Sequence, residues 1–479
     1  MIKKWSPTRG AEPRTESRSP MGKTCGSLVR GLISLYFNRK TFFKGSAVLA
    51  FTALLSNLLG LLRDRLLAHS FGAGTALDAY NAAFIVPNLL LNIFVAGALT
   101  AAFVPVFSGL ISRDRRQEAA EFANSVLNSS ILIVLITGLA VFIFAPQLSR
   151  WVVPGFTPES KVLFVNLMRL LLLSPLIFAI SNTLGNILVS EERFFWYGVS
   201  PVLYNVGIIG GVIFLTGRFG IYGAIIGVIG GALLHLISRL IGLARLSFAK
   251  QKFGGYRPKI KVDEHFKKYI RLMLPRMAGQ PIEQVMFLGF TVIASTIGTG
   301  AIVALNFANN FQTVPVAIIG ITFALTAFPV LAKIAAQNNR KDFIGETIFT
   351  AKAILLTTVP VAVFMYFFSR PIIAILIGGG AFDQHAINVT AATLAAFTPS
   401  IVTESVNHLL ARAFYALKNS ATPTLISSGG LVITLTSGYF LVEKFGIPGL
   451  ALGFLFGSIF KMVTHIIFLK ERARKTLQN

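Results

Sequence analysis

Twelve long apolar runs constrain this chain more than any other feature of its sequence. Each run could supply about 20 helical residues, the length that a hydrocarbon core of roughly 30 Å requires. Only 13% of the residues are charged and the mean hydropathy is +0.70, so a soluble globule of this length would lack polar surface. We therefore predict an all-α membrane protein with twelve transmembrane helices. The runs are Ser46–Ala68, Leu77–Leu110, Phe122–Pro146, Ser160–Val189, Phe194–Thr216, Gly220–Phe248, Phe266–Ile297, Ala301–Ala332, Ala353–Ile377, Ala386–Leu417, Thr424–Val442 and Ile447–Leu469.

The basic residues gather in short joints between these runs. The formal net charge of +25 would indicate nucleic-acid binding only if the basic residues shared one domain or face. Instead, basic joints alternate with joints that hold at most one or two basic residues, as the positive-inside rule describes. The pattern excludes a nucleic-acid partner and predicts that both termini are cytoplasmic. The basic joints carry Arg113, Arg115 and Arg116, then Arg193, Arg245 to Arg271, Lys333, Arg340 and Lys341, Lys418, and the Lys470–Lys475 tail.

The chain begins with a basic leader. A secretory signal would have a short apolar core directly after its basic start, whereas the first long run begins near Ser46. We expect the leader to stay in the cytoplasm, with Leu28–Phe43 either as a helix in the headgroup layer or as part of a disordered tail. The predicted division is a leader at 1–45, an N-lobe at 46–250 with helices one to six, a basic cytoplasmic linker at 251–265, and a C-lobe at 266–479 with helices seven to twelve and a short basic tail.

The two halves of the chain resemble each other. ALTAAFVPV at Ala98–Val106 recurs as ALTAFPVL at Ala324–Leu331, and a Val-Pro pair precedes each segment, which matches helix two to helix eight. A weaker similarity matches helices four and five to helices ten and eleven. Because six helices is an even number, the repeats cross the membrane in the same direction, related by a pseudo-two-fold axis along its normal. Two six-helix lobes around a central cavity are the design of alternating-access transporters.

Polar residues on three helices indicate which faces line this cavity. A helix with 3.6 residues per turn brings spaced positions to one side, and three such stripes recur. The alternative is that these side chains bind the helices together by hydrogen bonds, but matched stripes on repeat-related helices favour the cavity. The stripes are Asp78, Asn81, Asn88 and Asn92 on helix two, Asn306, Asn309, Asn310 and Thr313 on helix eight, and Glu404, Asn407, His408 and Arg412 on helix ten.

Charged residues inside the apolar runs point to the same cavity. Such a charge costs a few kcal/mol at the bilayer centre and is normally kept where it faces a bundle interior or water. Arg63 lies near the outer end of helix one, where the alternative is an interfacial cluster with Asp64 and Arg65. In helix seven we favour a cavity role for Arg276 over an internal pair with Glu283. We assign Glu283, Glu404, His408 and Arg412 to one hydrogen-bonded network at the cavity.

No residue set indicates catalysis or a metal. The lone Cys25 cannot form an internal disulfide, and no Cys and His residues have metal-ligand spacing. We therefore expect a protein that is not an enzyme, with no cofactor and no metal site.

Several segments carry a resemblance to a known family. The segments are GLLRDRLLAHSFGAG, LDAY, VPNLL, FVPVFSGL, PGF at Pro154–Phe156, LMLPR and LLARAFYALKNSATP. From about Ser46 to its end, the chain resembles the MurJ/MviN family of lipid II flippases, within the multidrug/oligosaccharidyl-lipid/polysaccharide exporter superfamily. The RAFYALK-x-x-x-TP match at Arg412–Pro423 is the most specific, together with the hairpin of helices one and two. The resemblance implies that two lobes around a cationic cavity carry undecaprenyl-pyrophosphate-linked peptidoglycan precursor from the inner to the outer leaflet of the bacterial cytoplasmic membrane.

The chain departs from this family at several cavity positions. Family members usually carry Arg in the positions of Asn57 and Asn310, and a basic pair where Leu91 and Asn92 stand. An arginine makes charge-assisted bonds to phosphate, whereas an asparagine both donates and accepts and so suits sugar and peptide groups.

We therefore hypothesise that arginines bind the phosphates and asparagines the neutral parts of the head group. Arg63, Asp78 and Arg276 match family positions. The predicted substrate site consists of Arg63, Arg276, Asp78, Asn57, Asn88, Asn92 and Asn310.

Two further classes of function stay open at this point. Within the same superfamily, the chain could flip another polyprenyl-linked glycan or act as a drug or cation antiporter. A non-transporting membrane scaffold would also fit the lost arginines. The expected partners are a lipid-linked oligosaccharide and membrane lipids, with a monomer as the unit and cell-wall synthesis proteins as possible contacts.

Overall fold

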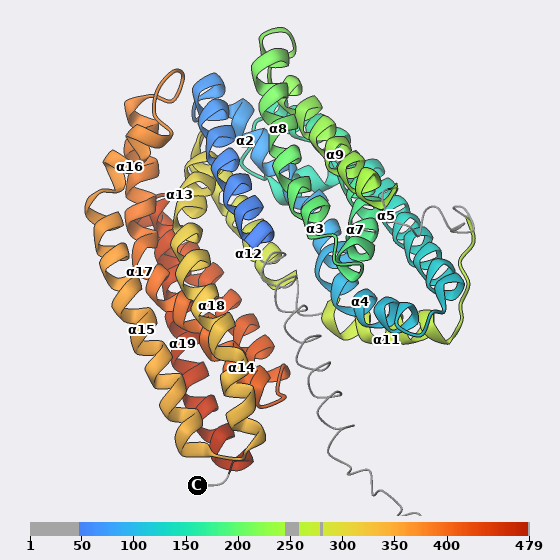
Figure 1. Ribbon diagram of the computed structural model, residues 1–479. Helices are drawn as coiled ribbons and strands as arrows, with labels where there is room; N and C mark the ends of the chain where they lie inside the picture. Colours follow the sequence, from blue (N-terminus) through green and yellow to red (C-terminus); the bar gives the residue numbers. More distant parts are fainter. Residues whose placement is uncertain (1–46, 245–257, 278–280, 478–479) are drawn as a thin grey trace, which may run out of the picture.

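The protein consists of helices gathered into two lobes (Figure 1). The computed structural model describes residues 47–244, 258–277 and 281–477, leaving out the side chains at 95–101, 275–277 and 281. Within these ranges the chain forms no β-strand, which agrees with the predicted all-α class. The predicted leader, including Leu28–Phe43, lies outside the described residues.

The N-lobe contains the first six membrane crossings. Helix two of the sequence prediction is one continuous path that contains a π-helical segment, η1, and helix four is divided into α6 and α7. The elements are a first helix at Ala47–Phe71, α2 (Thr75–Ala83), α3 (Ile85–Leu91), η1 (Asn92–Ala96), α4 (Gly97–Ile111), α5 (Arg116–Val152), α6 (Pro158–Leu171), α7 (Leu173–Ser190), α8 (Phe194–Phe219) and α9 (Ile221–Ala244).

The C-lobe contains the remaining crossings. Its helix eight also includes a π-helical segment, η2. The elements are α11 (Glu264–Met277), α12 (Pro281–Ile297), α13 (Ala301–Pro315), η2 (Val316–Ile321), α14 (Thr322–Ala336), α15 (Arg340–Phe367), α16 (Ser369–Leu376), α17 (Gln384–Ala416), α18 (Ala421–Phe445) and α19 (Pro448–Thr476).

Eleven helices in the described part are long and apolar enough to cross a membrane, and Ile282–Ile297 of α12 is a shorter apolar helix within the predicted seventh run. The prediction of one helix over Phe266–Ile297 is therefore wrong in its first half. Lys267, Lys268 and Arg271 alternate there with apolar residues, so α11 is amphipathic. It lies across the end of the N-lobe beside α4 rather than along the membrane normal (Figure 1).

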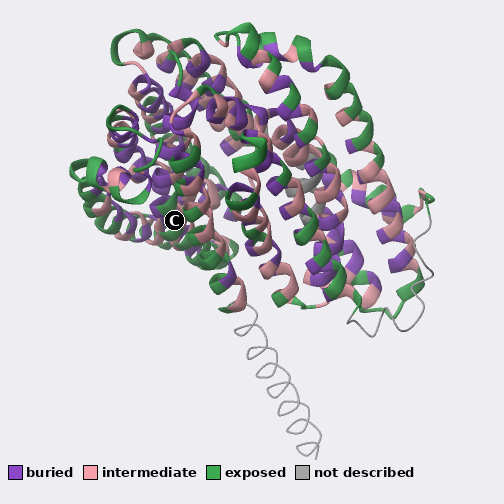
Figure 2. Ribbon diagram, turned by 90° about the horizontal axis from the view of Figure 1, so that it is seen from above, coloured by how far each residue is buried: buried purple, intermediate pink, exposed green. Residues whose placement is uncertain are grey.

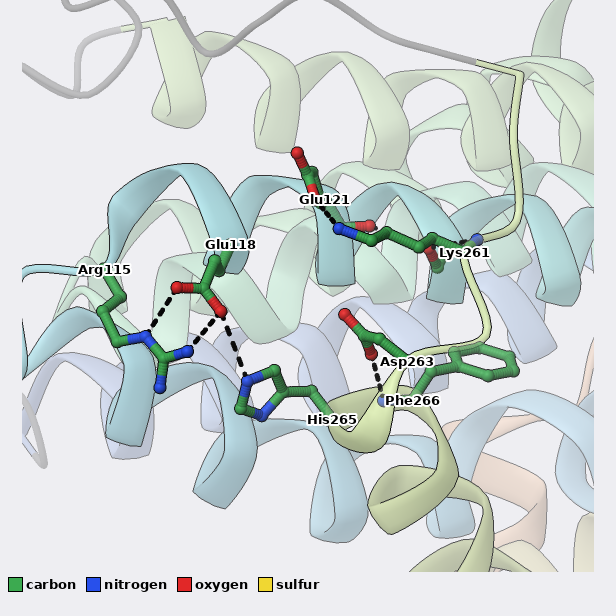
Figure 3. Close-up of polar contacts among 8 residues, drawn as sticks. Arg115, Glu118, Glu121, Lys261, Asp263, His265 and Phe266 are labelled. Carbon is green, nitrogen blue, oxygen red and sulfur yellow. Dashed lines mark hydrogen bonds and ion pairs between the residues drawn. The ribbon is translucent and has the colours of Figure 1, made fainter.

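Charged contacts attach the start of α11 to α5. The Lys261 amine lies 2.6 Å from the Glu121 carboxylate, and Nε2 of His265 lies 3.5 Å from Glu118 (Figure 3). The hydrogen bond that Lys261 donates to the Glu121 carboxylate raises the pKa of the Lys261 amine. Phe266 and Tyr269 are buried in the same apolar cluster as Phe103 and Phe122 of the N-lobe. The first part of helix seven is thus packed on the N-lobe.

Apart from α11, the described buried residues join the lobes at one end. We call this the closed end; it contains the joints at 72–74, 298–300 and 377–383. One buried cluster there includes residues of both lobes, such as Leu77 of α2, Ala301 of α13 and Phe382. At the opposite end, which we call the open end, the described buried residues form two separate clusters: one joins N-lobe helices to α11, and the other lies among α14, α15, α17 and α19 of the C-lobe. Exposed positions follow the outward faces of the helices (Figure 2).

The repeats are visible in glycine positions 226 residues apart. Gly72, Gly74, Gly220, Gly223, Gly227 and Gly231 have their counterparts in Gly298, Gly300, Gly446, Gly449, Gly453 and Gly457. A side chain at Gly231 would strike the carbonyl oxygen of Tyr204, and one at Gly457 would strike that of Gly430, which is the counterpart of Tyr204. Small residues let α8 pack closely on α9, and α18 on α19, as is common between membrane helices. The two lobes therefore repeat backbone contacts as well as helix order.

Candidate substrate site between the lobes

Arg63 lies in a polar chain that crosses from the N-lobe to the C-lobe. Its guanidinium donates to Oδ1 of Asp64 at 2.8 Å and to Oδ1 of Asn205 on α8 at 3.2 Å. The other carboxylate oxygen of Asp64 accepts a 3.0 Å hydrogen bond from Nδ2 of Asn310 on α13. Asp64 is only 6% exposed, so its charge depends on these two donors. The predicted residues Arg63 and Asn310 are thus brought together, with Asp64 between them.

Asp78 lies at the closed end and links α2 to the start of α13. Its carboxylate accepts from the backbone N–H groups of Gly300 and Val303, the latter at 2.9 Å. The first N–H groups of a helix lack partners within that helix, and a carboxylate there also interacts favourably with the helix dipole. Asp78 is 1% exposed. In this conformation it therefore binds the lobes together and is covered by protein.

Other contacts at the closed end are made by the backbone. The N–H of Ala381 donates to the carbonyl oxygen of His69 at 2.9 Å, and Arg65 donates to the carbonyl oxygen of Ile375 at 2.9 Å. A side chain at Gly72 would strike Ala381, and one at Gly300 would strike Ala73. Both glycines have positive φ, of 61° and 84°, which glycine tolerates best. The closed end is therefore formed by glycine joints in close contact.

The predicted asparagines lie on the open side of this closure. Asn57 is exposed on the first helix, and Asn88, Asn92 and Asn310 are half-buried. Nδ2 of Asn92 donates to the backbone carbonyl of Asn88 at 2.9 Å, beside the π-helical segment η1. Among the described contacts, the Asn88 side chain makes no hydrogen bond, and neither does the amide oxygen of Asn92. These groups are therefore free to bind a ligand.

Two members of the predicted site need a separate comment. The backbone of Arg276 belongs to α11, but its side chain lies outside the described residues. Glu283 is exposed in the first turn of α12 and lies within electrostatic range of Glu404 and Lys461. It is the repeat counterpart of Asn57, 226 residues later.

The polar stripe on helix ten contacts α19 inside the C-lobe. Glu404 forms an ion pair of 2.7 Å with Lys461, and both side chains are largely buried. Nδ2 of Asn407 donates to the carbonyl oxygen of Ser458 at 3.0 Å. Arg412 donates to the backbone carbonyl of His408 at 3.2 Å. The sequence analysis missed Lys461, although a lysine in an apolar run is the signal that identified Arg63.

The N-lobe has its own buried cation, which the sequence analysis also missed. Arg239 on α9 is 4% exposed and donates to the Ser181 carbonyl oxygen at 2.7 Å, to Oδ1 of Asn182 at 2.9 Å and to Oγ of Ser200 at 3.1 Å. Its guanidinium carbon lies 5.0 Å from the ring centroid of Tyr197. No carboxylate forms an ion pair with it in the described part of the chain, so neutral acceptors and one aromatic ring compensate for its charge.

Solved structures resemble this arrangement. A structure titled lipid II flippase MurJ, inward closed conformation, superposes with a TM-score of 0.77 at 26% identity, covering 90% of each chain. The inward-facing conformation of a multidrug resistance MATE family transporter of the MOP superfamily gives 0.76 at 17% identity, covering 88% of this chain and 95% of that one. The outward-facing conformation of such a transporter gives 0.60 at 18% identity, covering 91% and 96%. The MATE structures share the fold.

Sequence comparisons also show similarity to lipid II flippases. The chain is 26% identical over 432 residues to lipid II flippase MurJ of Burkholderia cenocepacia, covering 88% of this chain and 82% of the relative. It is 28% identical over 422 residues to probable lipid II flippase MurJ of Rickettsia prowazekii, covering 86% and 81%. The family model described as lipid II flippase MurJ matches residues 67–479, which is most of the chain. The chain therefore belongs to the MurJ family.

Proposed function

We propose that this chain flips lipid II, the undecaprenyl-pyrophosphate-linked peptidoglycan precursor, from the inner to the outer leaflet of the bacterial cytoplasmic membrane. The observation that carries the proposal is the one-sided closure of the lobes in a member of the MurJ family. Buried residues and the Asp78 contacts join the lobes at the closed end, whereas the open-end clusters are separate. A polar path between two such lobes lets a charged head group cross while its lipid tail stays in the bilayer.

The closed end is the outer end in this proposal. Its joints at 153–157, 298–300 and 377–383 carry no basic residue, whereas the joints at the open end are basic. The state is then inward-facing, with both termini in the cytoplasm, and the agreement with inward conformations of related folds supports it. We take the monomer as the working unit, and cell-wall synthesis proteins as its neighbours.

Thiol labelling tests this orientation. Cys25 is the only native cysteine and is replaced first. Thr299→Cys, in an exposed joint at the closed end, should react with an impermeant reagent added outside whole cells, whereas Lys259→Cys in the basic joint should be protected. The reverse labelling would contradict the orientation.

Arg63 and Arg276 bind the phosphates in this proposal, and Asn57, Asn88, Asn92 and Asn310 bind neutral groups. Arg63 is held by Asp64 and Asn205 in the inward-facing state. When the lobes part at the closed end, Asn310 leaves Asp64, so the Arg63–Asp64 pair is free to rearrange around a head group. Asp78 then acts on the equilibrium between states, because its partners on α13 belong to the opposite lobe.

A translocation assay in proteoliposomes tests these roles. Arg63→Ala and Arg276→Ala should each slow lipid II transfer about 10- to 100-fold, since a hydrogen bond to a charged group contributes about 1.5–3 kcal/mol. Single Asn→Ala changes at Asn57 or Asn92 should slow it less. Arg218→Ala, an exposed arginine at the end of α8, is the matched control and should leave transfer unchanged.

Full transfer by both arginine variants would contradict the assignment. Transfer of another polyprenyl-linked glycan instead of lipid II would indicate a flippase for that glycan. Transport of an organic cation instead of lipid II would indicate a drug or cation antiporter. Absence of transfer of any lipid by the folded protein would indicate a scaffold.

A further inference from the structure

The centre of the C-lobe contains more polar groups than its packing requires. Between α17 and α19, Glu404 binds Lys461 at 2.7 Å, and Oγ1 of Thr403 lies 2.6 Å from Oγ of Ser458. Asn407 adds a hydrogen bond to the Ser458 carbonyl oxygen at 3.0 Å. These groups lie far from both ends of α17 and α19, inside the membrane-spanning part of the lobe. The proposed function assigns no role to Lys461 or to its neighbour His465.

The hydrogen bonds determine the protonation state of His465. A backbone carbonyl only accepts, so Asn407 must point its amide nitrogen at Ser458 and its oxygen at Nδ1 of His465, 3.2 Å away. Nδ1 therefore carries the proton, and Nε2 of the neutral ring has a free lone pair. Nε2 is buried and has no hydrogen-bond partner among the described residues, in a side chain that is 2% exposed. A vacant proton acceptor is thus held inside the lobe.

The charges around His465 can compensate for one more proton. Lys461, one helical turn before it, and Glu404 are the charged groups within electrostatic range of its ring. Glu283 on α12 lies within range of that pair. Glu283, Glu404 and Lys461 together carry one net negative charge at neutral pH, which a proton on His465 would balance. His408 and the half-buried Arg412 lie further along α17 towards its open end.

The repeat places a different group at the position of His465 in the other lobe. The counterpart of His465 in the N-lobe is Arg239, and the counterpart of Lys461 is His235, each 226 residues earlier. An arginine keeps its proton in proteins. At the position of His465 the N-lobe therefore holds a fixed charge, whereas the C-lobe holds a group that can gain and lose a proton.

We propose that the C-lobe centre is a proton-binding site, with Nε2 of His465 as the acceptor, and that proton binding drives the change between inward and outward states. The proposal rests on the alternating-access function above and names its coupling ion. A proton on His465 places a second positive charge one turn from Lys461, which moves the lysine from Glu404 towards Glu283. Glu283 lies on α12, which packs on α18 of its own lobe and on α3 and α5 of the other. Proton binding thus acts on the helix that contacts both lobes.

The experiment measures lobe separation without lipid II. Spin labels at Arg113→Cys and Gln337→Cys, which are exposed at the open ends of the two lobes, report their distance in nanodiscs after replacement of Cys25. We expect the distance distribution to change as the pH is lowered from about 8 through and below the range in which a free histidine titrates, because the buried ring lies one turn from Lys461. His465→Asn keeps a donor for Asn407 but lacks Nε2, and should abolish the pH response. His385→Asn, an exposed histidine at the start of α17, is the matched control and should keep it.

Glu283→Gln gives a second arm, because this exposed residue can be changed without disturbing the buried centre. It removes the negative charge that favours the proton, so the midpoint should move to lower pH. An unchanged midpoint in this variant, or a full pH response in His465→Asn, would overturn the proposal. A response to sodium at constant pH, with none to pH, would also overturn it and indicate a metal cation.

The outcome separates this inference from the proposed function. A pH response that requires His465, in a protein that transfers no lipid II, would contradict only the proposed function. Transfer of lipid II with pH-independent distances would contradict only the proton site.

Discussion

The two lobes have the same backbone packing but hold their buried cations in different ways. Gly223 of α9 lies against the carbonyl group of Leu215, and its counterpart Gly449 of α19 lies against that of Leu441, the counterpart of Leu215. Yet Arg239 in the N-lobe is bound by three neutral oxygens, whereas Lys461 in the C-lobe is bound by the Glu404 carboxylate. The repeat therefore preserved the positions at which helices touch and allowed the charges between them to change. Four predictions test this difference, in decreasing order of expected effect.

The largest effect should follow from breaking the C-lobe ion pair. Lys461→Met leaves the Glu404 carboxylate buried and unpaired, which should lower the free energy of unfolding by about 3–5 kcal/mol. The double variant Lys461→Met/Glu404→Leu should cost less than either single change, because no charge is then left without a partner. Thermal unfolding of the purified protein measures all three. If the loss of stability in the double variant equals the sum of the losses in the two single variants, Lys461 and Glu404 do not interact directly.

The N-lobe cation should respond next most strongly. Arg239→Lys keeps the charge but replaces a planar fork by a single ammonium, which cannot reach three acceptors at once. We expect a loss of about 2–3 kcal/mol, since hydrogen bonds to charged groups contribute about 1.5–3 kcal/mol each. Arg218→Lys, at an exposed site, should stay within about 0.5 kcal/mol. Equal melting of the two variants would show that the fork at Arg239 is not needed.

The shared glycine packing should give equal effects in the two lobes. Gly223→Ala and Gly449→Ala each push a methyl group into a backbone carbonyl group of the neighbouring helix, at Leu215 and Leu441 respectively, and should each cost about 1–3 kcal/mol. Gly230→Ala is the matched control, because a Cβ there meets nothing within 4 Å and alanine favours the helix. Differential scanning of the three variants measures the contrast. A large cost at only one of the two packed glycines would show that the lobes do not pack alike.

The smallest effect should come from the surface pair that attaches α11 to the N-lobe. Lys261→Gln removes the contact with Glu121, and should lower the melting temperature slightly in low salt and not at all in high salt, because exposed charges are screened. The pKa of Lys261 is raised above 10.5 in the folded state, so the contribution is complete at neutral pH and is lost only as the pH rises through that raised value. Lys268→Gln, a change of an exposed lysine on α11 itself, is the control.

The sequence alone was sufficient to predict the fold class, the internal repeat and the family. The length of the apolar runs decided the fold class, because a bilayer requires helices of one particular length. The recurrence of ALTAAFVPV as ALTAFPVL matched helix two to helix eight, and both contain a π-helical segment in the structure. The motif at Arg412–Pro423 indicated the MurJ family, which the family model confirms. These features are local, and so they can be read from neighbouring residues.

The partners of the charged residues were decided only by the tertiary structure. Helical periodicity placed Asp78 and Asn310 on faces of their helices, but periodicity does not say which helix each face meets. Asp78 meets the start of α13, and Asn310 meets Asp64, a residue 246 positions away. Glu404 was grouped with its neighbours on helix ten, whereas its partner is Lys461 on α19. A buried charge must find an opposite charge or hydrogen-bond partners, and which ones it finds depends on how the helices pack.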